Sequence, residues 1–481
     1  MNRKMILYFI SWILKIEALC MLLPIITGLI YYEYQPVMDF VITAIICVVV
    51  SFIICPKKPS DSSFYTREGF VSVGFGWIFM SAFGAIPFVM DGCIPHYIDA
   101  VFEVISGFTT TGATILTDVE VLPKSMLAWR SFTHWLGGMG ILMFILALLP
   151  ALGQNSMHIV RAESPGITAG KLVAKSRTSA TILYAIYIAI TLLEIILLRL
   201  TGMKRFDALL ISFGTVGTGG FGVLNDSCGS YTAVQQIIIT VFMITCGTNF
   251  AFYYLLLAKK AKDAFKLEEV RWYFVIVVAS AVLIAINIYD KYASIGETLR
   301  HSFFQVASIM TTTGFSTVDF DQWPTFSKTI LISLMFIGAC AGSTGGGIKV
   351  SRIVIAVKTI GREFVELIHP RNVKVIKFEG KSIDEGTLRA VNTYIMTYVV
   401  LFAASLILVS IDGFSFESTF TAITATINNI GPGIAKVGPM MNYSEFSYFS
   451  KLVMSFDMLA GRLELFPMLL LFSMRTWRKS M

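Results

Sequence analysis

Apolar stretches of about 20 residues alternate with short polar stretches along the whole chain. A helix needs roughly 20 mostly apolar residues to cross the hydrocarbon core of a bilayer, so these stretches predict membrane-spanning helices. The clearest are Tyr8–Ile30, Phe40–Ile54, Gly69–Met90, Ala128–Pro150, Ile182–Leu200, Tyr273–Ile288, Leu331–Val357, Tyr394–Ile411 and Leu452–Phe472. The pattern is typical of an all-α polytopic membrane protein.

Four short polar segments interrupt the apolar pattern and align with one another on a glycine. They read ISGFTTTG, FGTVGTGG, ASIMTTTG and TATINNIG, and they end at Gly112, Gly220, Gly314 and Gly431. Each segment includes or follows an amphipathic run too short to cross a membrane, at Tyr97–Phe108, Phe206–Phe213, Thr298–Met310 and Phe416–Thr426. A long apolar stretch lies on either side. The repeated unit is therefore a membrane helix, a half-helix with a polar loop, and a second membrane helix.

Four such units, at residues 66–160, 176–262, 270–365 and 385–481, follow two additional membrane helices within residues 1–60. Ten spanning helices and four re-entrant ones result, with both termini on one side. Irregular backbone is tolerated at membrane depth only where protein buries it or where it lines a water-filled cavity. Four similar loops meet this condition most simply by facing one another, so we expect four pseudo-symmetric units around one pore.

The composition of the loops suits a monovalent cation. Backbone carbonyls replace the water around such an ion without adding formal charge, and glycine permits the backbone angles that this requires. Threonine hydroxyls brace the loop or add oxygen atoms near its entrance. Divalent ions usually recruit carboxylates, and no Asp or Glu stands beside the four glycines. One Thr-Thr-Thr-Gly alone is most often a helix cap or a turn, and it is the fourfold repetition that favours an ion site.

Charge is sparse and unevenly distributed: 14% of the residues are charged, against about 25% in soluble proteins. Most of the 38 Lys and Arg residues fall in loops on the side that holds both termini, which the positive-inside rule makes cytoplasmic. The net charge of +7 therefore describes orientation and requires no nucleic-acid partner. The seven cysteines form no C-x-x-C motif. Cys93 and Cys228 both fall on the expected outer side, where they either pair or are unrelated thiols.

Two features of the later units stand out. The segment LISLMFIGACAGSTGGGIKVSRIVIAV holds five glycines between Gly338 and Gly347, which at roughly 1 kcal/mol per helical glycine should break the helix. Close packing of helices at small residues is the alternative explanation. Arg462 lies inside an apolar segment, where an ionisable side chain usually faces a water-filled path. A structural ion pair with Asp457 or Glu464 is the other interpretation.

The four loops, NNIGPG at 428–433 and GSTGGGIK at 342–349 together resemble the Trk/Ktr/HKT superfamily of potassium transporters. The two extra N-terminal helices and the length are similar to its bacterial TrkH branch. The resemblance covers nearly the whole chain and implies one filter glycine per unit, with glycine in all four indicating K⁺ over Na⁺. The second loop departs from the pattern by offering both Gly219 and Gly220, and Phe221 favours Gly220 because Phe315 also follows Gly314.

The implied filter residues are Thr110, Thr111, Gly112, Thr218, Gly219, Gly220, Thr312, Thr313, Gly314, Asn429, Ile430 and Gly431. The implied K⁺ ligands among them are Thr111, Gly112, Gly219, Gly220, Thr313, Gly314, Ile430 and Gly431. The resemblance also implies a gate formed by Gly345, Gly346 and Gly347 with Arg462, whose charge would repel cations below the filter.

As partners, the resemblance implies a second copy of the chain and a cytosolic TrkA-like nucleotide-binding ring of the RCK type. It places the protein in the bacterial inner membrane and implies no cofactor beyond K⁺. The basic segments Val173–Arg177, Lys259–Arg271 and Lys349–Lys381 are candidate docking surfaces, although positive-inside charge alone also produces them.

Two other function classes fit the sequence less well. A Na⁺- or H⁺-coupled secondary transporter often has inverted repeats and mid-membrane carboxylates, whereas these units run in one direction and Glu103 and Glu194 are poorly placed. An enzyme is disfavoured because neither H-E-x-x-H nor G-x-S-x-G occurs. The glycine-rich stretches at 217–222 and 342–349 lack the preceding strand and the Lys-Ser/Thr ending of nucleotide-binding loops.

Overall fold

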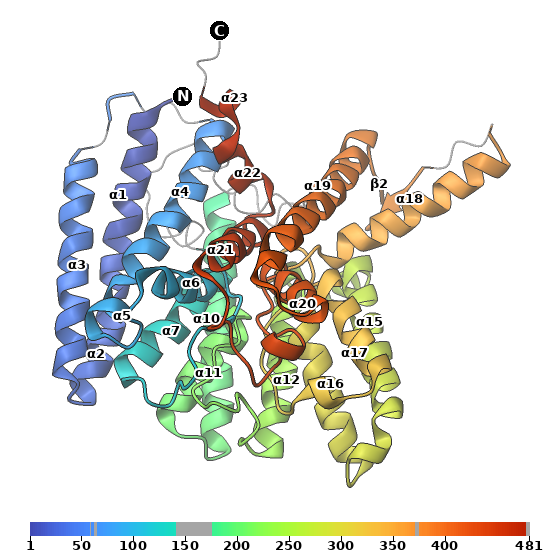
Figure 1. The fold of residues 1–481 in the computed structure, drawn as a ribbon. Coiled ribbons are helices and arrows are strands. Elements are labelled where there is room, and N and C mark those ends of the chain that lie inside the picture. The colour runs from blue at the N-terminus through green and yellow to red at the C-terminus, as the bar shows by residue number, and fades with distance from the viewer. Residues whose placement is uncertain (58, 62–64, 141–175, 371–374, 478–481) are drawn as a thin grey trace.

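The computed structural model describes residues 1–57, 59–61, 65–140, 176–370 and 375–477. The regular structure of this part of the chain is helical apart from one short antiparallel hairpin, formed by β1 (Lys377–Phe378) and β2 (Lys381–Ser382). Both chain ends lie on the same side of the molecule (Figure 1), which we call the terminal face. The opposite side is the distal face.

The two helices expected before the repeats are present. The first span consists of α1 (Arg3–Cys20) and α2 (Leu22–Ile30), and α3 (Tyr34–Ile54) returns beside it (Figure 1). Helix α1 packs against both α3 and the first helix of the first unit. These helices therefore lie at the edge of the fold.

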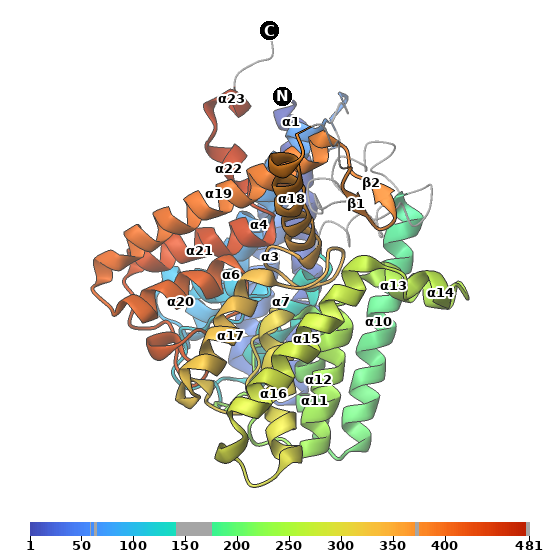
Figure 2. The same ribbon diagram turned by 90° about the vertical axis from the view of Figure 1, so that its right-hand side faces the viewer.

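Four units follow, each built from a long first helix, a short helix that ends inside the protein, and a second helix. The first helices are α4 (Thr66–Gly84) with α5 (Ile86–Asp91), α10 (Ser176–Leu200), α15 (Glu268–Asn287) and α19 (Glu385–Val409). The short helices are α6 (Tyr97–Phe108), α11 (Arg205–Gly217), α16 (Ile295–Met310) and α20 (Phe416–Ile427). The second helices begin with α7 (Lys124–Gly138), α12 (Ala233–Gly247), α17 (Thr325–Ile337) and α21 (Tyr448–Arg462). The views in Figures 1 and 2 show the four groups arranged around the middle of the molecule.

The longest apolar spans are the two N-terminal ones and the first helix of each unit. Within the described residues, six helices are long and apolar enough to cross a membrane: Arg3–Ile30, Tyr34–Ile54, Thr66–Asp91, Thr181–Leu200, Glu268–Asn287 and Glu385–Asp412. The apolar stretches thus correctly predict a multi-pass helical fold. The C-terminal ends of the short helices agree to within one residue, except that α11 continues four residues beyond the expected Phe213.

The second helices are interrupted. The break expected in the third unit is present, because α17 ends at Ile337 and α18 begins at Val350 and runs to Ile368. The second unit bends by 92° between α12 and α13 (Phe250–Leu257). The expected continuous helix Leu452–Phe472 is wrong, since α21 ends at Arg462 and α22 (Phe466–Phe472) starts after a turn. The predicted helix Ala128–Pro150 is described only as far as Gly140, and the rest lies outside the described residues.

A glycine stands at or beside each of these three interruptions: Gly247, Gly338 and Gly461. Two of them touch polar loops directly. A methyl group placed on Gly461 would lie 2.0 Å from the carbonyl oxygen of Ile427, and one on Gly247 would lie 2.6 Å from a Thr311 methyl carbon. The second helices therefore lack side chains where they pass the ends of the short helices.

All seven cysteines are free thiols in the structure, including Cys93 and Cys228. We therefore expect a thiol titration of the denatured, unreduced protein to detect seven thiols per chain, the same number as after reduction. A count that rises by two on reduction would contradict this expectation and support a Cys93–Cys228 bond.

Candidate functional site

Each short helix ends in the same hydrogen-bonded turn. The residue two positions before the aligned glycine has a left-handed backbone, with φ of +54° to +57° at Thr110, Thr218, Thr312 and Asn429. Its N–H donates to the carbonyl three residues back over 3.1–3.2 Å, and the next N–H donates to the carbonyl five residues back over 2.8–2.9 Å. This is the Schellman pattern of helix C-termini. It turns the backbone out of all four short helices at the equivalent position.

Three of these turns place threonine where glycine or asparagine is usual. A β-branched residue at positive φ is a backbone outlier that costs on the order of 1–3 kcal/mol and persists only where the surroundings hold it. The strain recurs at Thr110, Thr218 and Thr312. Recurrence at equivalent positions indicates a backbone shape that the site requires.

The four aligned glycines bring the loops into direct backbone contact. Gly112, Gly220, Gly314 and Gly431 all have positive φ, between +80° and +94°. A methyl group on each would collide with a carbonyl oxygen of the next loop: Gly112 with Gly219 at 2.2 Å, Gly220 with Thr313 at 2.0 Å, Gly314 with Ile430 at 2.1 Å and Gly431 with Thr111 at 2.6 Å. The contacts run in chain order and return to the start. The loops thus close into a ring, which we call the glycine ring: these four glycines and the residue before each.

The ring also settles which glycine of the second loop is equivalent to the others. Gly220 has the positive φ and the contact with the next loop, as its sequence context predicts. Gly219 is small for another reason, because a methyl group there would lie 2.2 Å from the His134 ring. His134 Nδ1 lies 2.7 Å from the carbonyl of Gly107, and its Nε2 accepts the Phe221 N–H at 3.1 Å. The imidazole therefore joins the first unit to the second behind the ring.

Threonine hydroxyls brace the loops. The hydroxyls of Thr109 and Thr111 lie 2.8 Å apart, and those of Thr311 and Thr313 lie 2.7 Å apart in the equivalent place. Asn429 Nδ2 donates to Thr111 Oγ1 at 3.0 Å, across the junction of the fourth and first units. Of the two roles expected for threonine, bracing is the one these contacts perform.

A buried ion pair stands behind the first loop. Glu103 accepts from Arg130 Nε at 2.6 Å, from the Thr114 hydroxyl at 2.9 Å and from the Ile115 N–H at 2.9 Å. The Arg130 guanidinium lies over the Phe221 ring, 3.7 Å from its centroid. Glu103, which the sequence suggested as a poorly placed coupling carboxylate, is thus neutralised and holds the chain that leaves the ring.

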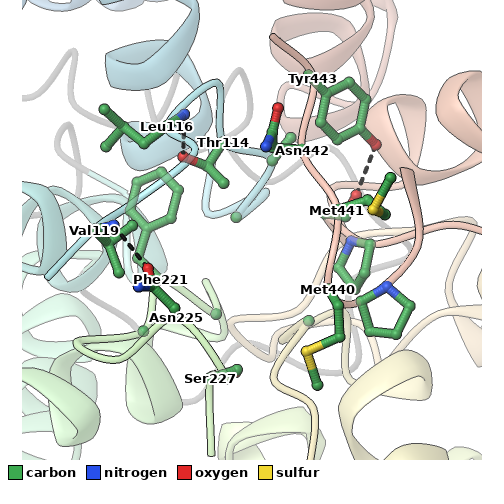
Figure 3. A pocket seen from close by; sticks show the side chains of 18 of the residues that line it. Thr114, Leu116, Val119, Phe221, Asn225, Ser227, Met440, Met441, Asn442 and Tyr443 are labelled. Carbon is green, nitrogen blue, oxygen red and sulfur yellow. Dashed lines mark hydrogen bonds between the residues drawn. The ribbon is translucent and has the colours of Figure 1, made fainter. Parts of the chain in front are cut away.

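On the distal side of the ring lies a cavity of about 160 Å³. It is lined mainly by residues that follow the aligned glycines, and Figure 3 shows Thr114, Phe221, Asn225 and Met440 around it. The hydroxyl of Tyr443 donates to the carbonyl of Gly431 at 2.7 Å, so the fourth loop is fastened in a way the other described loops are not. The volume suffices for several water molecules at about 30 Å³ each.

The 338–349 loop covers the other side of the ring. Gly346 N–H donates to Thr312 Oγ1 at 2.6 Å, and a methyl group on Gly346 would lie 2.6 Å from the carbonyl oxygen of Asn428. A methyl group on Gly345 would lie 2.8 Å from the carbonyl oxygen of Thr311. These partners precede the aligned glycines, whereas the residues of the distal cavity follow them. The loop therefore lies directly beneath the ring on the side of the terminal face.

Two cations hold this loop through its carbonyl groups. Arg462 donates to the carbonyl of Thr344 at 2.7 Å and to that of Gly138 at 2.7 Å, and it also contacts the carbonyl of Gly137. Lys349 Nζ contacts the carbonyls of Gly345 and Gly346. Sequence reasoning missed this role of Lys349, since it placed the residue at the start of a basic docking segment and not within the gate.

The carboxylates considered as partners of Arg462 bind other groups. Glu464 forms an ion pair with Arg352, and Asp457 accepts from the Ser405 hydroxyl at 2.7 Å. Arg462 and Lys349 line a cavity of about 130 Å³ together with the 338–349 loop. The Arg462 guanidinium thus lies against the 338–349 loop.

The chain is similar over nearly its whole length to known transport proteins. A family model described as "TrkH: Cation transport protein" matches residues 35–479. The chain is 35% identical over 469 residues to the Trk system potassium uptake protein TrkH of Salmonella typhimurium, covering 95% of this chain and 96% of the relative. It is 32% identical over 485 residues to TrkH of Halomonas elongata, covering 100% of both. The crystal structure of the potassium transporter TrkH from Vibrio parahaemolyticus matches with a TM-score of 0.89 at 31% identity, over 99% of this chain and 100% of that chain.

The glycine ring makes a prediction about stability. Gly112→Ala combines positive φ with a collision against the Gly219 carbonyl, whereas Gly413→Ala has the same backbone problem and open space around it. We expect G413A to cost about 1–2 kcal/mol and G112A to cost about 1–3 kcal/mol more. Thermal unfolding of the purified variants measures the difference. Equal melting temperatures for the two variants would show that the loops are further apart than the ring requires.

Proposed function

We propose that this chain, which belongs to the TrkH family of cation transport proteins, carries K⁺ into the cell across the bacterial inner membrane through the glycine ring. The observation that supports this most directly is the closed chain of contacts among the four glycines and the carbonyls of their neighbours. Curated relatives of similar length are named potassium uptake proteins. The chain acts as a transporter, and no step of this proposal requires enzymatic chemistry.

The physical basis is replacement of water by carbonyl oxygens. The carbonyls of Thr111, Gly219, Thr313 and Ile430 lie between adjacent loops, and with those of the four ring glycines they are our proposed K⁺ ligands. The C-termini of four short helices end just before the ring, so their negative dipole ends favour a cation there. Carbonyl oxygens without a carboxylate suit a monovalent ion, and the nearby Glu103 is neutralised by Arg130.

The 338–349 loop is our proposed gate. It lies under the ring, contacts it through Gly345 and Gly346, and is held by Arg462. Gly347, with φ of +75°, lies at its far end against Gly338. Conduction requires the loop to leave this position, and the positive charge of Arg462 adds an electrostatic barrier to a cation that passes it.

The terminal face is, on this proposal, the cytoplasmic face and the docking side for a TrkA-like RCK ring. Its basic segments include Lys259–Arg271 and the part of 349–381 beyond Lys349, which is itself buried. The segment Val173–Arg177 lies largely outside the described residues. Helix α18 exposes a run of apolar side chains, including Val357, Phe364 and Leu367, which we assign to contact with a second copy of the chain.

The coupled-transporter alternative differs in its driving force. If the chain conducts K⁺ without coupling, we expect the reversal potential measured with the protein in proteoliposomes to equal the Nernst potential of K⁺. It should not change with a pH gradient or a Na⁺ gradient. A reversal potential that follows either second gradient would favour coupling. Absence of Rb⁺ uptake both with and without the regulatory ring would refute K⁺ conduction itself.

The third ring glycine makes a prediction about selectivity. A side chain at Gly314 would lie 2.1 Å from the Ile430 carbonyl oxygen, so Gly314→Ser must displace a proposed ligand. We expect the K⁺ over Na⁺ permeability ratio to fall about tenfold, which corresponds to ~1.4 kcal/mol. Gly413→Ser is the control, since nothing lies within 4 Å of that position. Reversal potentials in mixed K⁺ and Na⁺ measure the ratio, and an unchanged value in G314S removes Gly314 from the filter.

Arg462 makes a prediction about conduction. Arg462→Ala removes both a positive charge and the bonds that hold the loop at Thr344. Two unit charges 4 Å apart repel by about 4 kcal/mol at an effective dielectric constant near 20, so we expect basal Rb⁺ flux to rise about tenfold or more. Arg462→Lys keeps the charge and should remain much closer to the parent protein. Parent-like flux in a well-folded R462A protein would leave only a structural role for this arginine.

A further inference from the structure

One carboxylate outside the ring binds both flanks of the 338–349 loop. Glu269 Oε1, on α15, accepts the N–H of Ala341 at 2.7 Å and the N–H of Ser351 at 3.1 Å. Ser351 lies in the first turn of α18, whose N-cap residue Lys349 makes no capping bond with its side chain. Glu269 is buried. It therefore supplies the missing cap of α18 and fastens the loop at the same time.

The helix that carries Glu269 is capped in the same way by a more distant carboxylate. Helix α15 starts after Leu267, which offers no polar side chain. Glu379 fills this role, because its two oxygens accept the N–H groups of Glu268 and Glu269 at 3.0 Å each. Anions at helix N-termini are favoured by the unpaired N–H groups and by the helix dipole.

Glu379 stands at the tip of the hairpin on the terminal face (Figure 2). It and Gly380 form a two-residue turn with φ of +52° and +73°, between the paired residues Phe378 and Lys381. Such turns prefer asparagine, aspartate or glycine at the first position, so glutamate is held there in a strained conformation. The strain is explained if the longer side chain is needed to reach the start of α15.

The hairpin is tied to the helices around it. Phe378 is buried in the same apolar cluster as Val354 of α18 and Val277 of α15. Lys358 Nζ donates to the Lys377 carbonyl at 2.7 Å and pairs with Glu268 at 2.5 Å. A displacement of the hairpin therefore acts on the N-terminus of α15, which carries Glu269.

We propose that Glu269 is the positioning residue that keeps the 338–349 loop under the glycine ring, and that Glu379 connects it to the hairpin on the terminal face. The proposal rests on the gating role proposed above for this loop. The two carboxylates form a relay of helix caps, from hairpin to α15 and from α15 to the loop. A partner that pulls on the hairpin thereby loosens the loop without touching it.

Cys340 provides a readout that does not depend on conduction. Its side chain is fully buried within the loop, so it reacts slowly with a maleimide while the loop stays in place. Labelling of the full-length purified protein, followed by mass spectrometry of the Cys340 peptide, reports how often the loop leaves. Glu269→Ala should raise the labelling rate about tenfold or more, since it removes two hydrogen bonds to a charged acceptor.

Three further variants separate positioning from general destabilisation. Glu269→Gln retains an oxygen that can accept both N–H groups and should restore slow labelling. Glu379→Ala should raise labelling by a smaller factor although it lies outside the loop. Glu385→Gln makes the same kind of change at an exposed glutamate that pairs with Arg362, and it serves as the unchanged control.

The same variants in proteoliposomes link the loop to transport. E269A and E379A should raise basal Rb⁺ flux in the order of their labelling rates, with an unchanged K⁺ over Na⁺ permeability ratio. Parent-like labelling of Cys340 in E269A, or equally fast labelling in E269Q and E269A, overturns the positioning role. Should E269A fail to fold, parent-like labelling in E379A overturns the relay. Increased labelling with no Rb⁺ flux in any variant, the parent included, would instead refute the proposed function.

Discussion

The close approach of four backbone segments sets the terms for the rest of this fold. A carbonyl oxygen of one loop occupies the place where a side chain of the preceding loop would begin, at Gly112, Gly220, Gly314 and Gly431 in turn. Four separate helices must therefore end at the same depth and in the same turn. Neighbouring helices must also leave room for these helix ends. This explains why second helices carry glycine beside the ends of the short helices, as at Gly461 against Ile427.

The charged side chains around the ring are each compensated by a nearby partner group. In a low-dielectric interior a lone charge is costly, and near the ring Glu103 pairs with Arg130 and Glu464 pairs with Arg352. Arg462 and Lys349 instead donate to backbone carbonyls of the 338–349 loop. These carbonyls are available only because the helix is broken there. The break and the two cations are consequently one arrangement, which stabilises the loop in the position where it covers the ring.

Much of this could be predicted from sequence because the signals are local and repeated. Glycine at equivalent positions identifies the four loops, and the helix break in the third unit follows from five clustered glycines. The break after Arg462 has only one local signal, Pro467 in the first turn of α22, and this proline does not by itself fix where the preceding helix ends. Contact of Gly461 with the fourth loop, a tertiary interaction, decides it.

The carboxylate caps of α15 and α18 could not be predicted from the sequence for a related reason. Glu269 lies 82 residues before Ser351, and Glu379 lies 111 residues after Glu268. Capping is recognised in sequences through residues beside the helix start, and neither Leu267 nor Lys349 suggests a cap. The sequence shows only that α15 and α18 start after residues that are poor caps, Leu267 and Lys349.

The ring and the loop beneath it differ in how they are held, and this difference decides which of them can move. The ring continues four helices through buried backbone hydrogen bonds, and every loop supports its neighbour. The 338–349 loop has left its helix and is held by bonds to Thr312, Arg462 and Glu269 and by backbone bonds to Cys246, Gly247 and Phe250. Each contributes about 0.5–3 kcal/mol net, so releasing the part of the loop that lies beneath the ring requires several kcal/mol. That amount is within what differential binding of a partner can supply, whereas opening the ring would disrupt all four units together.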